Sequence, residues 1–292
     1  MTASNPLRDE PARHLDTTAH LMNGISSPLA DRLRPVHPGG RRRTAPAAAR
    51  DAAPPVLVLV AHGSRDPRAF DTVRALAGLV RALRPSLRVR LGHIELNEPL
   101  LPDTLAALGA APAVLVPLLL GRGYHVKRDI PEMAAAASAR ARVAAPLGPH
   151  PLLVETLHAR LTEAGWRPDT AARGTSAVVL AAAGSRDPDS AADTRRTARL
   201  LAGRLGVPVV PAYASAATPT VATALRALAA RGRPDVAVAS CFTAPGRFAT
   251  QCAAQAPGIA SAPLGAHEAM ARLVLHRYDQ ARATAGARPA SA

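Results

Sequence analysis

Hydrophobic and polar residues follow two alternating periods from about residue 55 onward. The run VLVLV at 56–60 is continuously apolar, which is typical of a strand covered on both faces. Residues 69–83 instead place apolar side chains three to four positions apart, which predicts a helix. The same alternation predicts strands at 88–94 and 113–119, and helices at 102–108, 131–142 and 152–164. Short strands that alternate with helices favour an α/β fold with parallel sheets and right-handed crossovers.

The second half of the chain repeats the first. VLVLVAHGSRDP at 56–67 matches AVVLAAAGSRDP at 177–188, and three more blocks follow in the same order. A duplication explains four matched blocks better than chance does. The further pairs of blocks are 74–108 with 197–228, 113–130 with 236–253, and 146–161 with 263–278.

The duplication predicts the domain organisation. We expect two similar α/β lobes, each a small parallel sheet flanked by helices, at 55–168 and 174–281. Residues 1–54 are rich in Pro, Arg and small residues without a clear period, so they are interpreted as a disordered leader. Residues 282–292 are small and polar, and they are expected to form a flexible tail.

Three polar residues follow predicted strands of the first copy. His62 comes after 56–60, Glu95 ends 88–94, and His125 lies in a glycine-rich loop after 113–119. Ligands of such sheets bind at the carboxyl ends of the strands, so these groups can converge in one crevice. Two imidazoles and a carboxylate suit a divalent metal such as Fe2+, Co2+, Ni2+ or Zn2+. Taken singly, each histidine has an ordinary explanation as a cap or packing residue, and the glutamate as a solvated carboxylate.

The repeat offers an internal test of this trio. A residue that the fold requires should occur in both copies, whereas a residue needed for one site can be lost from the other. The second copy lacks all three residues, which favours a single metal site per chain, in the first lobe. The second copy places Ala183, Ser215 and Phe248 where the first has His62, Glu95 and His125.

Residues that both copies share have a structural interpretation. Ser64 is expected to cap the following helix, with Arg65 and Asp66 as a local pair, although Ser64 and Ser185 could also bind a carboxylate there. Histidines at 150 and 267 also match, which favours capping or packing. His93 lies on the same strand face as Glu95, one step deeper, where packing is more common than metal binding.

Composition narrows the function classes. The net charge is +15 and the one lysine is Lys127, so arginine supplies nearly all of the basic residues. Aromatic residues make up 2%, which disfavours the stacking platforms of nucleic-acid-binding proteins. Two cysteines exclude a disulfide framework and a four-cysteine zinc site. No apolar run reaches the length of a membrane helix and the start lacks a secretion signal, so we expect a cytoplasmic protein without membrane or nucleic-acid partners.

Four motifs resemble those of the sirohydrochlorin chelatases of the CbiX or SirB type, which belong to the class II chelatases. The motifs are AHGSRDP at 61–67, HIELNEP at 93–99, VPLLLGRGYHVKRDIP at 116–131 and LGPHPLL at 147–153. In that family the two motif histidines bind the incoming metal, which implies this role for His62 and His125, and the strand-end glutamate matches Glu95. The duplicated chain resembles the long bacterial forms, in which one half keeps the metal-binding residues.

The resemblance implies insertion of a divalent metal into sirohydrochlorin without ATP, with Fe2+ slightly favoured over Co2+, toward sirohaem or cobalamin. The metal ion and sirohydrochlorin are then the partners, and no permanently bound cofactor is expected. Neutral imidazoles can hold the ion loosely and accept the two pyrrolic protons that the ring loses. The substrate's peripheral carboxylates are expected to contact Ser64, Arg65, Lys127 and Arg128.

Two other interpretations remain open on the sequence. A non-catalytic carrier of metal or tetrapyrrole could use the same crevice, and it would bind without accelerating metallation. A basic nucleic-acid-binding module is disfavoured by the apolar strands and by the absence of a recognisable basic helix.

Overall fold

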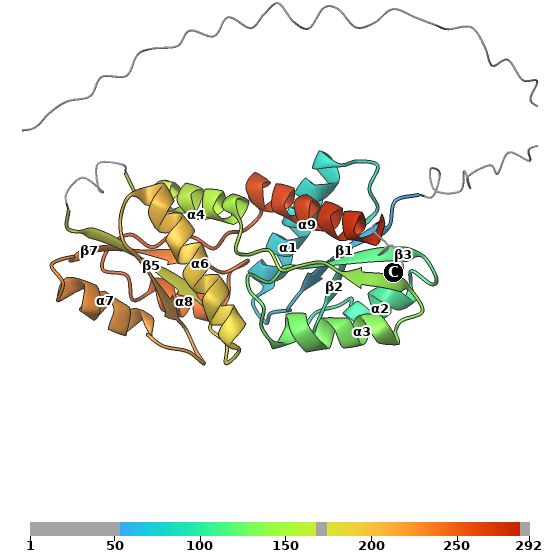
Figure 1. Cartoon of the computed structure of the whole chain (residues 1–292), viewed down its shortest axis with the longest axis horizontal. Coiled ribbons are helices and arrows are strands. Elements are labelled where there is room, and N and C mark those ends of the chain that lie inside the picture. Colours follow the sequence, from blue (N-terminus) through green and yellow to red (C-terminus); the bar gives the residue numbers. More distant parts are fainter. Residues whose placement is uncertain (1–52, 168–173, 287–292) are drawn as a thin grey trace, which may run out of the picture. The chain divides into compact units, whose positions relative to one another are not determined.

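The computed structural model describes residues 53–167 and 174–286. The expected leader, apart from Ala53 and Pro54, lies outside the described residues, as does the tail beyond 286. The first lobe is built around a four-stranded parallel sheet of order β2-β1-β3-β4 (Figure 1). In chain order its elements are β1 (Val56–Ala61), α1 (Pro67–Leu83), β2 (Val89–His93), α2 (Leu101–Ala106), β3 (Pro112–Pro117), a π-helical turn η1 (His125–Asp129), α3 (Ile130–Ala136) and β4 (Arg140–Val143).

The second lobe repeats this arrangement with a three-stranded parallel sheet of order β6-β5-β7. Its elements are β5 (Ser176–Ala182), α6 (Pro188–Leu205), β6 (Val209–Tyr213), α7 (Val221–Ala229), β7 (Asp235–Ser240) and α8 (Arg247–Ala253). The central strands β1 and β5 are buried at every position, as their continuous apolar runs predict for strands covered by helices on both faces. The predicted α/β class with two similar parallel-sheet lobes is confirmed.

The backbone of the two lobes matches in detail at the loops after β1 and β5. Gly63 and Gly184 both have positive φ, at 105° and 91°. A Cβ at Gly63 would lie 1.8 Å from the carbonyl oxygen of Glu95, and one at Gly184 would lie 1.9 Å from that of Ser215. Glycine is therefore required at both turns by the close approach of the neighbouring strand end. This shared requirement explains why the GSRDP string occurs twice.

Two long helices cross between the lobes. Helix α4 (Pro151–Glu163) follows the first sheet in the chain, yet it packs on α6 and β7 of the second lobe (Figure 1). Helix α9 (Glu268–Gly286) ends the described chain and packs on α1 and β3 of the first lobe. Tyr278 of α9 is fully buried and donates a hydrogen bond to the carbonyl of Pro55 at 2.6 Å.

This exchange differs from the boundaries that the sequence predicts. Ranges of 55–168 and 174–281 assign each crossing helix to the lobe opposite the one it packs on. The expected tail is also partly wrong, because α9 continues to Gly286. Because α4 and α9 each pack on the opposite lobe, residues of both lobes belong to one hydrophobic core.

A second difference concerns the predicted helix at 131–142. Helix α3 ends at Ala136, and the edge strand β4 follows, pairing with β3 from Pro112↔Arg140 to Leu115↔Val143. The alanine-rich sequence has high helix propensity, but pairing with an open sheet edge outweighs that preference. Among the helices of the described residues, none combines the length and the apolarity needed to cross a membrane.

Candidate functional site

The structure brings His62, Glu95 and His125 together. They follow β1, β2 and β3, which are neighbours in the first sheet, so all three lie at its carboxyl edge. The imidazole centroids of His62 and His125 are 4.6 Å apart, with their planes at 81°. Nδ1 of His62 lies 3.4 Å from Oε1 of Glu95. Glu95 and His125 therefore both lie beside the His62 ring at this edge.

Each imidazole has a carboxylate behind it. Glu95 faces Nδ1 of His62, and Asp129 faces Nδ1 of His125, with its Oδ2 atom 2.5 Å away. A carboxylate that accepts the Nδ1 proton fixes the tautomer and leaves the Nε2 lone pair free to bind a metal ion. At His125 this contact is a hydrogen bond, whereas Glu95 lies at ion-pair distance from His62, so the tautomer argument applies directly to the His125 ring.

Sequence reasoning missed Asp129. The signal was its spacing of four residues from His125, which brings two side chains to one face of a helical turn. The turn η1 is π-helical, and the backbone N–H of Ile130 closes it by donating to the carbonyl of His125. Single π-turns of this kind occur frequently at functional sites.

The surroundings of His62 favour its neutral form. Its contact with the crevice wall removes water from the ring and lowers its pKa, and the neighbouring His125 lowers the pKa further. Glu95 partly offsets both effects. A histidine that is neutral at pH 7 has the lone pair that a divalent cation requires.

The site is open. Within 53–167 and 174–286, no three His, Cys, Asp or Glu side chains already stand where they would hold a metal ion together. Glu95 is turned toward the His62 ring, so two imidazoles are ready and the carboxylate would have to swing to become a third ligand. An incomplete ligand set suits transient binding, because a closed four-ligand cage retains its ion.

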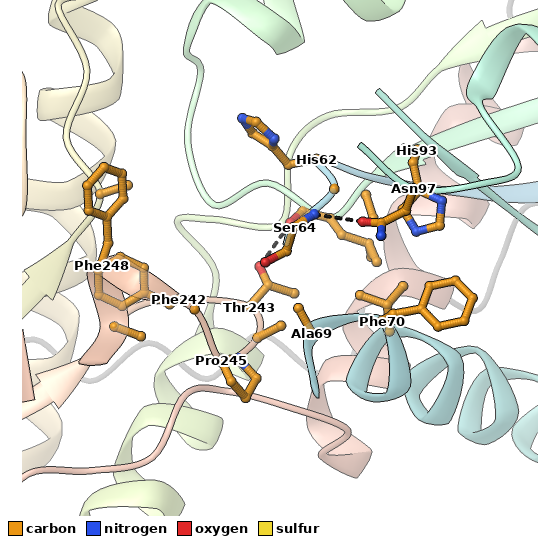
Figure 2. A pocket seen from close by; sticks show the side chains of 18 of the residues that line it. His62, Ser64, Ala69, Phe70, His93, Asn97, Phe242, Thr243, Pro245 and Phe248 are labelled. Atoms are coloured by element: carbon orange, nitrogen blue, oxygen red, sulfur yellow. Dashed lines mark hydrogen bonds between the residues drawn. The ribbon is translucent and has the colours of Figure 1, made fainter. Parts of the chain in front are cut away.

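Two adjoining cavities form a crevice between the lobes, with volumes of about 350 and 390 Å³. His62, Phe242 and Phe248 line both of them. Figure 2 shows His62 between the rings of Phe242 and Phe248 on one side and the rings of Phe70 and His93 on the other. Volumes of this size are typical of small-molecule sites.

The second lobe turns its own degenerate copy of the site toward this crevice. Ala183, Ser215 and Phe248, the counterparts of the metal trio, line the larger cavity together with His62 and His125. The two lobes therefore present equivalent loops to one shared space, and imidazoles come from the first lobe alone.

Four residues were expected to bind the substrate's carboxylates, and the structure places them differently. Ser64 lines the smaller cavity. Arg65 is exposed and lines neither cavity. Lys127 is engaged by Asp187 at 2.7 Å and Asp189 at 2.9 Å, both on the second lobe. Arg128 lies 3.8 Å from Glu132 of the following helix, α3.

Beside Lys127, Arg122 ties the loop of His125 to the second lobe. The backbone N–H and the Nε atom of Arg122 both donate to Oδ2 of Asp193 at 3.0 Å, and its Nη2 donates to Oδ1 at 2.8 Å. The Asp193 side chain is only 6% exposed, so this contact fixes the loop against a buried carboxylate.

The shared residues have the structural roles that the repeat suggests, with one correction. His150 and His267 cap α4 and α9, since their Nδ1 atoms accept from the N–H groups of Leu152 and Ala269. The cap of α1, however, is Asp66 rather than Ser64, because the side chain that accepts from the N–H of Arg68 is that of Asp66. Asp66 also pairs with Arg68 instead of with Arg65.

His93 has a packing environment. It is 1% exposed, its Nδ1 atom lies 3.2 Å from the carbonyl of Pro99, and its ring lies 5.7 Å from that of Phe70. The carbonyl can only accept, so the Nδ1 proton is on this atom and the ring is held in place. The cysteines are buried, and burial raises the pKa of Cys241 to about 12.

The known proteins with similar sequences include several named sirohydrochlorin cobaltochelatase. The sirohydrochlorin cobaltochelatase of Methanococcus aeolicus is 39% identical over 80 residues, which is 26% of this chain and 56% of the relative. That of Priestia megaterium is 32% identical over 155 residues, which is 50% of this chain and 49% of the relative. The chain thus spans about half the length of these curated relatives.

Solved structures agree on the fold. SirB from Bacillus subtilis with Fe3+ has a TM-score of 0.65 at 24% identity, covering 80% of this chain and 98% of SirB. CbiX, described as the terminal enzyme for biosynthesis of siroheme in denitrifying bacteria, has a TM-score of 0.59 at 22% identity, covering 77% of this chain and 99% of CbiX.

Fold and crevice together define a two-lobed α/β protein of the chelatase class. The CbiX family model matches residues 56–164 and again 177–281. The chain belongs to the CbiX family, in a form that carries the family unit twice.

Proposed function

We propose that this chain is a sirohydrochlorin chelatase, which inserts Fe2+ or Co2+ into the metal-free ring without ATP. The observation that carries the proposal is the pair of imidazoles, each backed by a carboxylate, that faces the crevice between the lobes. Family membership supports the same reaction.

In this proposal His62 and His125 hold the incoming cation through their Nε2 atoms. Glu95 and Asp129 orient the rings and add the negative charge that attracts a cation into the crevice. As the ion leaves for the ring, each imidazole regains a free lone pair and can accept one of the two pyrrolic protons. Glu95 is within reach as a further acceptor, because it contacts the His62 ring.

Substrate contacts follow from the lining. Ser64 offers a hydroxyl to a peripheral carboxylate, and the exposed Arg65 can reach one outside the cavity. Lys127 and Arg128 could serve only by leaving Asp187, Asp189 and Glu132. Of the four residues expected to bind the carboxylates, we therefore propose Ser64 and Arg65 as the main contacts.

The test is anaerobic metallation of sirohydrochlorin followed by absorbance, with Fe2+, Co2+ and Ni2+ in parallel. The expected result is a rate well above that of the uncatalysed reaction for Fe2+ or Co2+. Binding of the ring and the ion without acceleration would instead identify a carrier. Competition between the two ions at equal concentration would then establish the preferred metal.

A further inference from the structure

The phenylalanines of this protein are concentrated in the crevice. The chain has three of them, and Phe70, Phe242 and Phe248 all line the smaller cavity. Phe242 and Phe248 line the larger cavity too, so they stand where the two cavities meet. Aromatic residues make up only 2% of the sequence, which makes this clustering at one place unusual.

Phe248 occupies the position of a lost metal ligand. It stands eight residues beyond the end of β7, just as His125 stands eight residues beyond the end of β3. The second copy has therefore exchanged an imidazole for an apolar ring without withdrawing it from the shared crevice. Leucine or alanine would have removed the ligand equally well, whereas phenylalanine keeps a flat ring there.

A cation accompanies this ring. The guanidinium carbon of Arg247 lies 4.9 Å from the centroid of the Phe248 ring, and Arg247 also lines the smaller cavity. Its side chain is exposed, and it forms no ion pair with a carboxylate of the described residues. The basic residues around His125 differ in this respect, since Arg122 and Lys127 are held by carboxylates of α6 and its cap.

We propose that Phe248 and Arg247 form the substrate-recognition wall of the second lobe: the Phe248 ring packs on the flat face of the tetrapyrrole, and Arg247 binds one of its peripheral carboxylates. Phe242 extends the same apolar surface. The inference rests on the proposed function and gives the degenerate copy a role within it. The two copies would then divide the work, one holding the metal ion and the other holding the ring.

The chemistry of the wall matches such a ligand. An extended conjugated ring gains both apolar burial and aromatic contact from Phe248, which an aliphatic side chain supplies only in part. The planar guanidinium binds carboxylates through two parallel hydrogen bonds, and its position over Phe248 restricts its freedom before the ligand arrives. A metal ion alone gains nothing from either group, so the wall selects the ring rather than the cation.

The experiment measures ring binding and metal binding separately on the full chain. Metal-free sirohydrochlorin is titrated anaerobically into the wild type, Phe248→Leu, Phe248→Tyr and Arg247→Gln, with its fluorescence as the signal. Co2+ is titrated in parallel without the ring. Arg231→Gln is the matched control, because Arg231 is another exposed arginine of the second lobe, at the opposite end of β7 from the crevice.

We expect Phe248→Leu to weaken ring binding about tenfold, and Phe248→Tyr, which retains the ring, to change it by less than about threefold. Arg247→Gln should weaken it about fivefold and reduce its dependence on salt, because one charge pair is lost. Co2+ affinity should stay within about twofold in every variant. In turnover the Phe248→Leu defect should appear in KM with kcat preserved, as expected for uniform binding.

The inference is overturned if the wild type binds and metallates the ring while Phe248→Leu and Arg247→Gln bind it as the wild type does. It is also overturned if Arg231→Gln weakens binding as much as Arg247→Gln does, since a general charge effect would then explain the result. If the wild type itself neither binds nor metallates sirohydrochlorin, the proposed function fails, and this inference fails with it.

Discussion

The two lobes have matching backbone turns after β1 and β5 and differ in the side chains that line the crevice. At equivalent loop positions the first lobe has His62, Glu95 and His125, and the second has Ala183, Ser215 and Phe248. The glycine turns that position these loops are retained in both, because each glycine approaches a strand-end carbonyl too closely for a side chain. Within a single chain, the two lobes thus distinguish the residues that the fold requires from the residues that one site requires.

The largest expected effect comes from removing an imidazole of the first lobe. His62→Ala or His125→Ala should lower the metallation rate about 100-fold or more, because each change deletes a proposed metal ligand and proton acceptor. Folding should be unaffected, since the two side chains are 45% and 35% exposed. Initial rates and thermal unfolding measure the two properties. Ser215→Ala, at the second-lobe position of Glu95, is the control, and wild-type rates in both histidine variants would refute the assignment.

A smaller effect is expected from the carboxylate behind His125. Asp129→Asn should weaken Co2+ binding about 10- to 100-fold, because the amide oxygen is a weaker, uncharged acceptor for the Nδ1 proton and the amide NH2 can take its place, so the tautomer is no longer fixed. Isothermal titration with Co2+ measures the change. The matched control is Glu132→Gln on the following helix, whose carboxylate is 68% exposed and 3.8 Å from Arg128. Equal affinities for the two variants would show that Asp129 has no orienting role.

The charged contact between the lobes also has no counterpart at the equivalent positions of the repeat. Arg122 of the first lobe holds the buried Asp193 of α6, while the equivalent positions, Pro245 and Thr72, carry no charge. Asp193→Asn should lower Tm by about 2–4 °C, because the charge-assisted bonds to the guanidinium weaken. Thermal unfolding followed by circular dichroism measures this. Thr72→Val, on the matching helix, should shift Tm by less than about 1 °C, and a larger shift there would contradict the asymmetry.

The smallest effect concerns the capping histidine of α4. Burial, followed by the charges of Arg277 and His276, lowers the pKa of His150 to about 4 from its usual 6.5. Between these values the unfolded chain binds the proton more readily, so the contribution of His150 is complete above pH 6.5 and is lost as pH falls toward 4. His150→Asn keeps a capping group, and we expect it to reduce the loss of stability over this range.

Denaturant unfolding at a series of pH values measures that slope. His267→Asn, the equivalent change at the cap of α9, gives at pH 7.5 the cost of exchanging the capping group itself. An unchanged slope in His150→Asn would show that this ring does not contribute to acid sensitivity.

Much of the fold could be predicted because it depends on local pattern. The continuous apolar run of β1 and the helical period of α1 each specify their element directly. The convergence of His62, Glu95 and His125 could be predicted because all three follow strands of one parallel sheet, whose carboxyl ends lie at the same edge. Asp129 was within reach of the same reasoning, because its spacing from His125 places both on one turn.

What the sequence did not predict depends on distant partners. The segment that becomes β4 has a helical composition and forms a strand only because the edge of β3 is available. Nothing local specifies which lobe α4 and α9 cover, since an amphipathic face fits either sheet. Lys127 was likewise predicted to contact the substrate, because the sequence does not show that Asp187 and Asp189 of the second lobe bind it.

The crossing of α9 has a consequence for how the chain is made. The first lobe needs this helix to cover α1 and β3. Arg84 of α1 donates hydrogen bonds of 2.7 and 2.8 Å to Asp279 of α9, which lies 195 positions later in the sequence. During synthesis the amino-terminal half therefore emerges from the ribosome without its last covering layer. Its core closes only after α9 has been translated, so the early half is exposed to aggregation and proteolysis until then.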